Sequence, residues 1–328
     1  MAQHFLLSGK ARTLSLAAIL RMSDEEAYEA FKSIRFADNE GAPFCPKCGA
    51  VDLYALPRRK MWRCKAKECG CQFSITSGTI FSSRKLSIRD VLAAIAVFTN
   101  GAKGYSALQL SRDLDVQYKT AFVLAHKLRE AIAAQDRNAK VSGEVEIDGM
   151  YAGGYVKPAN HKENRRDRRL ARNQNGKRMV VIAARERNGK IVTFVSKTED
   201  QGVEGLENRI EVGSTVYADE ASHWDAMHAR YETKRINHSL AYSDGEGCTN
   251  QVESFFSRLR RAEIGTHHKI AGRYLAAYAA EMDWREDNRR VSNGEQYRAI
   301  VTAAARHPVS RQWKGYWQRR AAGGNQAV

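Results

Sequence analysis

Residues 249–261 read Thr-Asn-Gln-Val-Glu-Ser-Phe-Phe-Ser-Arg-Leu-Arg-Arg, with the spacing of an amphipathic α-helix that Thr249 is placed to cap. Apolar residues recur every three or four positions and form one stripe: Val252, Phe255, Phe256 and Leu259. Asn250 and Glu253 lie one turn apart on a second face. Three arginines gather at the far end, where cations suit the helix dipole: Arg258, Arg260 and Arg261. Taken alone this is an ordinary surface helix, but a rigid carboxylate beside a carboxamide and arginines also suits a metal ion and a phosphate backbone.

Composition narrows the class of protein. The chain has 328 residues, of which 43% are hydrophobic, enough for two or three domains with their own cores. Its formal net charge of +16 indicates a polyanionic partner, DNA or RNA first, with a basic ribosomal or membrane-surface protein as the structural alternative. No apolar run approaches membrane-spanning length, and residues 1–10 do not form a signal peptide. We therefore expect a cytoplasmic, nucleoid-associated protein with no membrane partner.

Five of the six cysteines fall between positions 45 and 71, in two clusters about fifteen residues apart. In a long, basic, non-secreted chain this favours a zinc ribbon over disulfides or free redox thiols. We predict one structural Zn²⁺ with four thiolate ligands: Cys45, Cys48, Cys64 and Cys69. Cys71 is the alternative fourth ligand. We prefer Cys69, because Cys71 directly precedes Gln72-Phe73, where the closing strand should begin.

Helical patterns surround this ribbon. Residues 11–36 and 86–100 read as helices, the first with a cap at Ser23. Residues 105–116, a tight turn and residues 117–134 resemble a DNA-binding helix-turn-helix. Two cations on the second of these helices are candidate DNA contacts: Lys119 and Lys127. An ordinary helical hairpin joining two domains is the alternative interpretation.

From residue 143 the period changes from helix to strand. In residues 144–148, Val145 and Ile147 share one face while Glu144, Glu146 and Asp148 share the other. Residues 179–184 and 191–195 read as a hairpin around Asn188-Gly189. Residues 214–219 form a strand that ends on Asp219. Helices are expected at 200–210, 222–231 and 269–288, which together predict an open α/β sheet.

Residues 157–178 have almost no apolar periodicity and are rich in Lys and Arg. Such a run is usually a solvated face, but in this chain it is also a plausible DNA clamp. Four arginines in it are candidate DNA-backbone contacts: Arg165, Arg166, Arg168 and Arg169.

Three acids occupy positions that can meet at one crevice of an open α/β sheet: Asp148 in a strand, Asp219 at a strand end and Glu253 on the helix. Three carboxylates can hold two divalent cations about 3.5–4 Å apart, which activate water or a 3′-hydroxyl in phosphodiester chemistry. Oxygen ligands select Mg²⁺ or Mn²⁺. We expect Glu253 rather than Asn250 as third ligand, because a carboxylate neutralises cation charge. Asn250 would orient groups or contact substrate.

Several segments resemble bacterial insertion-sequence transposases with a zinc ribbon and an ISXO2-like DDE domain, relatives of the eukaryotic Merlin transposases. The matching segments lie at 45–49, 72–81, 145–148 with Gly153-Gly154, 217–219, 249–261 and 264–268. The resemblance implies an RNase-H-like catalytic fold that cuts and joins DNA at transposon ends. Three departures stand out: Gly149 where the family often has an acid, Arg260 or Arg261 where it often has Lys, and the insertion at 157–178.

We therefore predict a multidomain α+β protein. Its expected parts are an N-terminal helical segment (1–40), a zinc ribbon (41–82), a helix-turn-helix-like domain (83–138), an RNase-H-like DDE domain (139–300) and a basic tail (301–328). We expect an active transposase that binds DNA as a homodimer or higher oligomer. A domesticated DNA-binding regulator without catalysis is the alternative, and a plain metal-dependent nuclease is a third.

Overall fold

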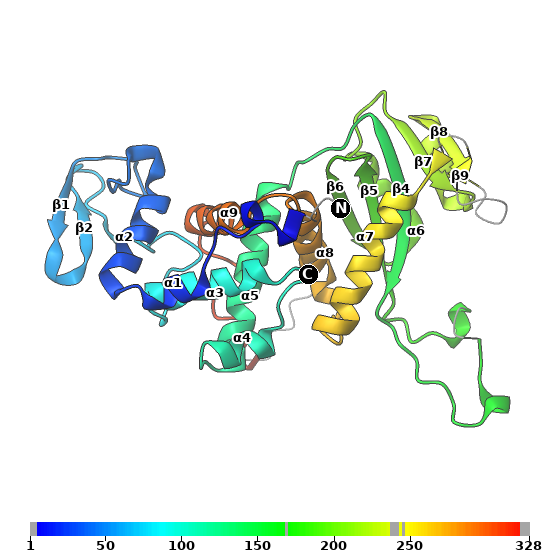
Figure 1. The fold of residues 1–328 in the computed structure, drawn as a ribbon, viewed down its shortest axis with the longest axis horizontal. Helices are drawn as coiled ribbons and strands as arrows, with labels where there is room; N and C mark the ends of the chain where they lie inside the picture. The colour runs from blue at the N-terminus through cyan, green and yellow to red at the C-terminus, as the bar shows by residue number, and fades with distance from the viewer. Residues whose placement is uncertain (1–4, 168–169, 237–242, 245–246, 322–328) are drawn as a thin grey trace. The chain divides into compact units, whose positions relative to one another are not determined.

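The computed structural model describes residues 5–167, 170–236, 243–244 and 247–321. The protein is a mixed α+β chain with two compact units, one formed by residues 1–135 and 290–328 and the other by residues 136–289 (Figure 1). Arg168, Arg169 and the last seven residues of the predicted basic tail lie outside the described residues. No helix within the described ranges has the length and apolarity needed to cross a membrane.

After two 3₁₀ turns, Phe5–Leu7 and Gly9–Ala11, the N-terminal unit has two α-helices in the stretch predicted as helix over 11–36. They are α1 (Leu16–Arg21) and α2 (Asp24–Arg35). The predicted cap at Ser23 is confirmed, and it breaks the helical stretch because it starts a new helix: the Ser23 hydroxyl accepts the Glu26 N–H while the Glu26 carboxylate accepts the Ser23 N–H. This reciprocal capping box satisfies two N–H groups at the start of α2.

A small antiparallel sheet follows α2 in the order β1-β2-β3, with strands Leu53–Leu56, Met61–Cys64 and Gln72–Ser74. Its core is aromatic. Phe73 is buried against Trp62, and Trp62 meets Phe36 edge to face at the end of α2. These few rings are a small core for a sheet of three short strands, which fits a unit that depends on a metal.

The remainder of this unit is helical. The central helix α3 (Ile88–Asn100) is buried from Val91 to Thr99 and packs against α1, α2 and α9 (Asn293–Arg306). The predicted helix pair is present as α4 (Ala107–Asp113) and α5 (Tyr118–Gln135). The helix α9 was not predicted from the sequence, and it brings the chain back to pack on α3 and α5. A last short helix, α10, spans Tyr316–Ala321.

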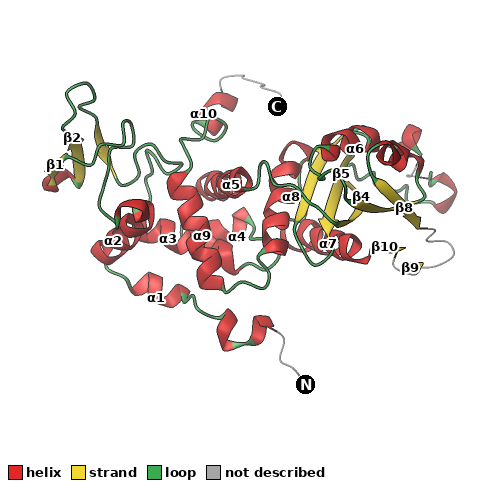
Figure 2. Ribbon diagram, turned by 90° about the horizontal axis from the view of Figure 1, so that it is seen from above, coloured by secondary structure: helices red, strands yellow, loops and turns green. Residues whose placement is uncertain are grey.

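The second unit is built on a five-stranded sheet in the order β6-β5-β4-β7-β8 (Figure 2). Strands β4 (Glu144–Ala152), β5 (Met179–Glu186) and β6 (Ile191–Ser196) form an antiparallel meander. Strands β7 (Thr215–Asp219) and β8 (Glu232–Ile236) run parallel to β4. The predicted hairpin is confirmed, with Asn188 in the left-handed conformation that its turn requires.

Helices cover both faces of this sheet. On one face α6 (Glu199–Glu207) and the 3₁₀ segment Ser222–Ala229 pack on odd-numbered residues of β4, with Val145 and Ile147 beside Leu206 and Trp224. The helix predicted over 222–231 is present as this 3₁₀ segment, and β8 starts at Glu232. On the other face α7 (Asn250–Arg261) and α8 (Gly272–Asp287) pack on even-numbered residues, Met150 and Ala152 among them.

The basic segment 157–178 has no α-helix or strand in its described part. It contains only two single 3₁₀ turns, Lys162–Asn164 and Ala171–Asn173. Between β8 and α7 the described residues form a pair of two-residue strands, β9 (Ser243–Asp244) and β10 (Gly247–Cys248).

Candidate metal sites and nucleic-acid contacts

The ribbon brings four thiols together. The Sγ atoms of Cys45, Cys48, Cys64 and Cys69 all lie within 4.8 Å of one another. Two of the distances, Cys45 to Cys69 and Cys48 to Cys64, are 3.6 Å. A tetrahedral zinc ion with Zn–S bonds of about 2.3 Å would hold its sulfur atoms about 3.8 Å apart. The thiols therefore fit a closed structural zinc site.

Backbone N–H groups approach each of the four thiols. Each Sγ faces the N–H two residues further on, from Lys47, Ala50, Ala66 and Cys71 in turn. Burial raises the pKa of the Cys45 thiol, but the N–H groups of Lys47 and Cys48 and the thiols of Cys48 and Cys69 together outweigh burial and bring that pKa to about 7. The pKa values of the other three thiols, Cys48, Cys64 and Cys69, are raised, because burial and the neighbouring thiols outweigh the N–H groups there. Ligands of zinc must be deprotonated, so these donors favour the bound form.

Cys71 lies outside the group of four. Its Sγ contacts the carbonyl of Gln72 at 3.7 Å, and its own carbonyl accepts the Cys64 N–H at 2.9 Å. Cys71 thus contributes through its backbone: it donates to the Cys69 sulfur and joins Cys64 just ahead of β3.

Asp148 and Asp219 are brought together by the pairing of β4 with β7. The last pair of this parallel ladder is Glu146 with Tyr217, and each aspartate lies two residues further along its strand. Both side chains are half-buried. Since side chains alternate along a strand, Asp148 is on the face of β4 that α7 covers, between Glu146 and Met150.

Hydrogen bonds hold one oxygen of each carboxylate. Asp219 Oδ1 accepts the Trp224 indole N–H at 2.6 Å and the Ala221 N–H at 3.0 Å. Asp148 Oδ1 accepts the N–H of Gly149 at 2.7 Å. Both carboxylates are thereby oriented, Asp219 at the end of β7 and Asp148 within the neighbouring strand β4.

The helix α7 has the apolar stripe that its sequence predicts, since Val252, Phe255, Phe256 and Leu259 are all buried. Its predicted cap is wrong. Thr249 makes no capping bond, and its hydroxyl instead donates to Glu253 Oε1 at 2.9 Å. The N–H groups of Gln251 and Val252 donate to the carboxylate of Glu146, at 2.8 and 3.2 Å. The cap is therefore supplied by another element, β4.

Asn250 and Glu253 are both exposed in the first turn of α7. Within the part of the chain that the structure describes, the cysteines form the only group of three or more Asp, Glu, His or Cys side chains whose ligand atoms lie within 4.8 Å of one another. The two aspartates are thus paired by the sheet, whereas Glu253 is directed to Thr249 and does not join them at one point.

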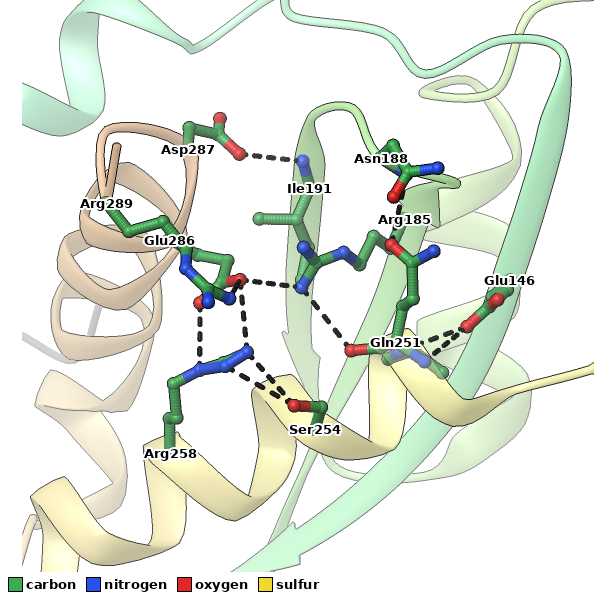
Figure 3. A network of polar contacts seen from close by, with 11 residues as sticks. Glu146, Arg185, Asn188, Ile191, Gln251, Ser254, Arg258, Glu286, Asp287 and Arg289 are labelled. Atoms are coloured by element: carbon green, nitrogen blue, oxygen red, sulfur yellow. Dashed lines mark hydrogen bonds and ion pairs between the residues drawn. The ribbon is translucent and has the colours of Figure 1, made fainter. Parts of the chain in front are cut away.

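The three arginines of α7 differ in their surroundings. Arg258 forms an ion pair with the buried Glu286 of α8 at 3.0 Å and donates to Ser254 (Figure 3). Arg185 of β5 and Arg289 reach the same carboxylate at 2.9 and 3.0 Å. Burial raises the pKa of Glu286, but these guanidinium groups outweigh burial and lower it. Arg260 and Arg261 are exposed, and Arg261 donates to Ser257 at 2.8 Å.

The remaining candidate DNA contacts lie on exposed or half-buried surface. Lys119 is exposed at the start of α5, with its ammonium 5.5 Å from the centre of the Trp317 ring. Lys127 is half-buried, and burial lowers its pKa. In the basic segment Arg165 donates to the carbonyls of Ala159 and Asn160, and Arg166 is exposed.

Two features of the second unit were not predicted from the sequence. Glu146 is fully buried, although the alternation of residues 144–148 suggested only a polar face. On α8, Asp287 accepts the Ile191 N–H at 3.1 Å (Figure 3), and burial, with a further contribution from Asp136, raises its pKa to about 7. Sequence periodicity places such acids on a face but does not show what covers that face.

Comparisons with known proteins agree with this division of the chain. Residues 140–287 match the ISXO2-like transposase domain, and residues 22–72 match the transposase zinc-ribbon domain. An uncharacterized protein in transposable element ISH50 of Halobacterium salinarum is 24% identical over 294 residues, which cover 86% of this chain and 97% of that protein. No solved structure matches the chain.

Proposed function

Because the chain belongs to the insertion-sequence transposases that combine a zinc ribbon with an ISXO2-like domain, we propose that it binds the ends of its element and cuts and joins DNA there. The observation that carries this proposal is the placement of Asp148 and Asp219 at matching positions on neighbouring parallel strands. Side-by-side carboxylates of this kind suit the metal-dependent hydrolysis and transfer of phosphodiesters.

We propose that the second unit is an RNase-H-like DDE domain. Support comes from its sheet, in which a three-stranded antiparallel meander is followed by two strands parallel to the first. Helices on both faces leave the carboxyl end of β7 and the neighbouring part of β4 as the place where Asp148 and Asp219 meet.

The donor chemistry of this place fits a hard divalent cation, since the aspartates offer oriented oxygen ligands at partly exposed positions. We propose that Asp148, Asp219 and Glu253 hold two Mg²⁺ or Mn²⁺ ions. When bound, such ions supply an activated water or 3′-hydroxyl and stabilise the leaving oxygen. Glu253 joins the aspartates by exchanging its bond with Thr249 for the metal site.

The other groups of α7 take different roles in this proposal. Asn250, exposed in the same first turn, contacts the substrate or orients a ligand. Arg260 and Arg261 bind a DNA phosphate, because they project from the last turn and take part in none of the ion pairs formed among the described residues. Arg258 is instead held by Glu286, which assigns it to packing α7 on α8.

The first unit is proposed to recognise the element ends. One Zn²⁺ on Cys45, Cys48, Cys64 and Cys69 maintains the ribbon. Lys119 and Lys127 of α5 contact DNA in a helix-turn-helix-like arrangement. The segment 157–178 of the second unit adds backbone contacts. We propose that the protein acts at the nucleoid as a homodimer or higher oligomer, because joining requires that both ends be held together.

Cleavage of end DNA tests this function. Uncut and pre-cut element ends are incubated with wild-type protein in Mg²⁺ and in Mn²⁺. Glu253→Gln should abolish cleavage and leave DNA affinity within about twofold, since the fold and the basic surface remain. Asn250→Ala should slow the reaction without stopping it. Glu204→Gln, which changes an exposed helical glutamate on α6, is the matched control and should cut normally.

Other results would reassign the site or the function. Normal cutting by Glu253→Gln with a dead Asn250→Ala would make Asn250 the third ligand. A wild-type protein that binds the ends but cuts none of them in either metal would favour a domesticated regulator. Cutting without joining would favour a plain nuclease. Inverted repeats that bracket the gene would independently support transposition.

A further inference from the structure

Glu146 is a fully buried acid at the centre of the second unit. A carboxylate removed from water is costly unless charged or hydrogen-bonding partners compensate it. Glu146 has both kinds. Its Oε2 accepts the N–H groups of Gln251 and Val252, and its Oε1 pairs with the Arg187 guanidinium at 3.2 Å. The strand β4 thus supplies an anion to the N-terminus of α7, where the helix dipole favours negative charge.

Arg187 contacts residues from several of the elements that surround Glu146. It follows β5 directly, and its guanidinium also reaches Glu144 at 3.3 Å and the carbonyl of Cys248 at 3.4 Å. The same group lies 4.0 Å from the centre of the Tyr217 ring on β7. The start of α7 is therefore anchored to three strands through one ion pair.

This anchor lies between the groups assigned to the reaction. Glu146 and Asp148 are two residues apart on one face of β4, a separation of about 7 Å along the strand. The two N–H groups that donate to Glu146 belong to Gln251 and Val252. These two residues lie directly between Asn250 and Glu253 in the chain. The hydrogen bonds from Gln251 and Val252 to Glu146 therefore fix the position of the first turn of α7 relative to Asp148. Farther along the helix, the Arg258–Glu286 ion pair fixes the second contact (Figure 3).

We infer that Glu146 is a positioning residue: its buried carboxylate holds the first turn of α7 so that Glu253 and Asn250 meet the metal-binding pair Asp148 and Asp219. This inference rests on the proposed function and deepens it, because it names the residue on which the third ligand depends. Glu146 itself contacts neither metal nor DNA. It acts through the backbone of α7.

The first test is independent of activity. Hydrogen exchange is followed in peptides covering residues 249–256 and 179–186 of wild-type protein, Glu146→Gln and the matched control Glu144→Gln. Glu144 is on the same strand and also pairs with Arg187, but its other hydrogen bond is to Tyr217 of β7 rather than to α7. Glu146→Gln should speed exchange in 249–256 by about tenfold to a hundredfold, as expected for a lost charge-assisted hydrogen bond, and leave 179–186 unchanged. Glu144→Gln should change neither peptide.

The second test measures end cleavage at saturating DNA over a range of Mg²⁺ concentrations. Glu146→Gln should lower the rate by about tenfold to a hundredfold and raise the Mg²⁺ concentration needed for half-maximal rate, with DNA affinity within about twofold. Glu146→Asp, which keeps the charge, should recover part of the rate. In a Glu253→Gln background, Glu146→Gln should cause little further loss, because both changes remove the same ligand.

The outcomes separate this inference from the proposed function. Unchanged exchange in 249–256, or equal acceleration in both peptides, would overturn the positioning role whatever the activity. So would a rate that falls only in proportion to the folded fraction, with no change in Mg²⁺ dependence. If wild-type protein cuts no DNA, the proposed function fails while exchange still decides whether Glu146 holds α7. Should Glu146→Gln not fold, Glu146→Asp against Glu144→Asp provides the same exchange comparison.

Discussion

Asp148 and Asp219 stand at matching positions on two neighbouring parallel strands, each two residues beyond the last pair of the β4–β7 ladder. Neighbouring strands lie about 4.8 Å apart, so carboxylates at matched positions on one face are close enough to share cations. Neutral donors orient them: the Trp224 indole and the Ala221 N–H for Asp219, and the Gly149 N–H for Asp148. These donors fix the direction of the bonded oxygen in each carboxylate.

Replacing either aspartate by asparagine should abolish cleavage of end DNA in Mg²⁺. The carboxamide of Asp219→Asn would keep an oxygen for the Trp224 and Ala221 donors, so this variant should fold normally and bind DNA as wild type does. The loss arises from the missing ligand charge. Cleavage is measured on labelled ends and affinity by electrophoretic mobility. A variant that cuts at more than a tenth of the wild-type rate, by our rough threshold, would remove that aspartate from the proposed site.

Zinc content should distinguish the two candidate cysteines. Cys69→Ser should lose the single zinc and unfold the ribbon, because three thiolates no longer close the shell. Cys71→Ser should keep it, since Cys71 contributes its backbone N–H and carbonyl instead of its sulfur. Metal analysis of the purified variants gives the answer. Zinc retained in Cys69→Ser but lost from Cys71→Ser would transfer the fourth ligand to Cys71.

The arginines of α7 should separate into a stabilising one and DNA-binding ones. Arg258→Ala should destabilise the second unit by about 1–3 kcal/mol, because Glu286 is buried and loses one of its three guanidinium partners. Arg260→Ala and Arg261→Ala should instead weaken DNA binding with little effect on unfolding. Calorimetry and DNA titrations on the same samples compare the two effects. Reversed results would return Arg258 to the DNA surface.

DNA affinity should fall steeply with salt, with a log–log slope of about −0.9 for each phosphate neutralised. Neutralising Arg165, Arg166, Arg168 and Arg169 together should flatten this slope and weaken binding to all sequences alike. The first two are exposed in a segment without strand or α-helix among its described residues. Filter binding at several salt concentrations measures the slope. A changed sequence preference at constant slope would contradict a backbone role.

Asp287 should make the stability of the second unit depend on pH. Burial raises its pKa from 3.8 to about 7, so the folded state binds this proton more tightly than the unfolded state. The contribution of Asp287 to the free energy of unfolding therefore falls as pH rises from about 4 to 7 and is constant above that range. The side chain of the Asp287→Asn variant can still accept the Ile191 N–H. The free energy of unfolding of this variant relative to wild type should therefore increase by on the order of 1–2 kcal/mol as pH rises from 5 to 8.

Comparing the variant with wild type at each pH cancels the titration of the other groups. The charged groups that interact with Asp287 are Asp136, Asp283, Lys190 and Arg185, and all four are retained in the variant. Thermal unfolding at pH 5 and pH 8 gives the difference. Equal differences at the two values would show that Asp287 titrates normally in the folded protein.

Much of the architecture was predictable from local sequence. The period-two pattern around Val145 and Ile147, the Asn188-Gly189 turn and the apolar stripe of α7 each describe one element, and the structure contains all three. The cysteine spacing likewise predicted the group of four thiols that the structure brings together. These patterns can be read from the chain because each depends on residues a few positions apart.

Other features depended on contacts between residues far apart in sequence. The cap of α7 came from Glu146, more than a hundred positions upstream, and Thr249 turned to Glu253 instead. Likewise, Arg258 differs from Arg260 and Arg261 only because α8 places Glu286 beside it.

The sequence by itself therefore determined the candidates for the chemistry: the thiols of the ribbon, the acids Asp148, Asp219 and Glu253, and the basic surface. Only the tertiary structure decided which of them lie together and which are already engaged. Sequence periodicity assigns a side chain to one face of a helix or strand, and the net charge indicates a class of partner. What covers that face, and whether a charge is buried against an opposite one as Glu146 is against Arg187, is set by the packing of α7 and α8 on the sheet.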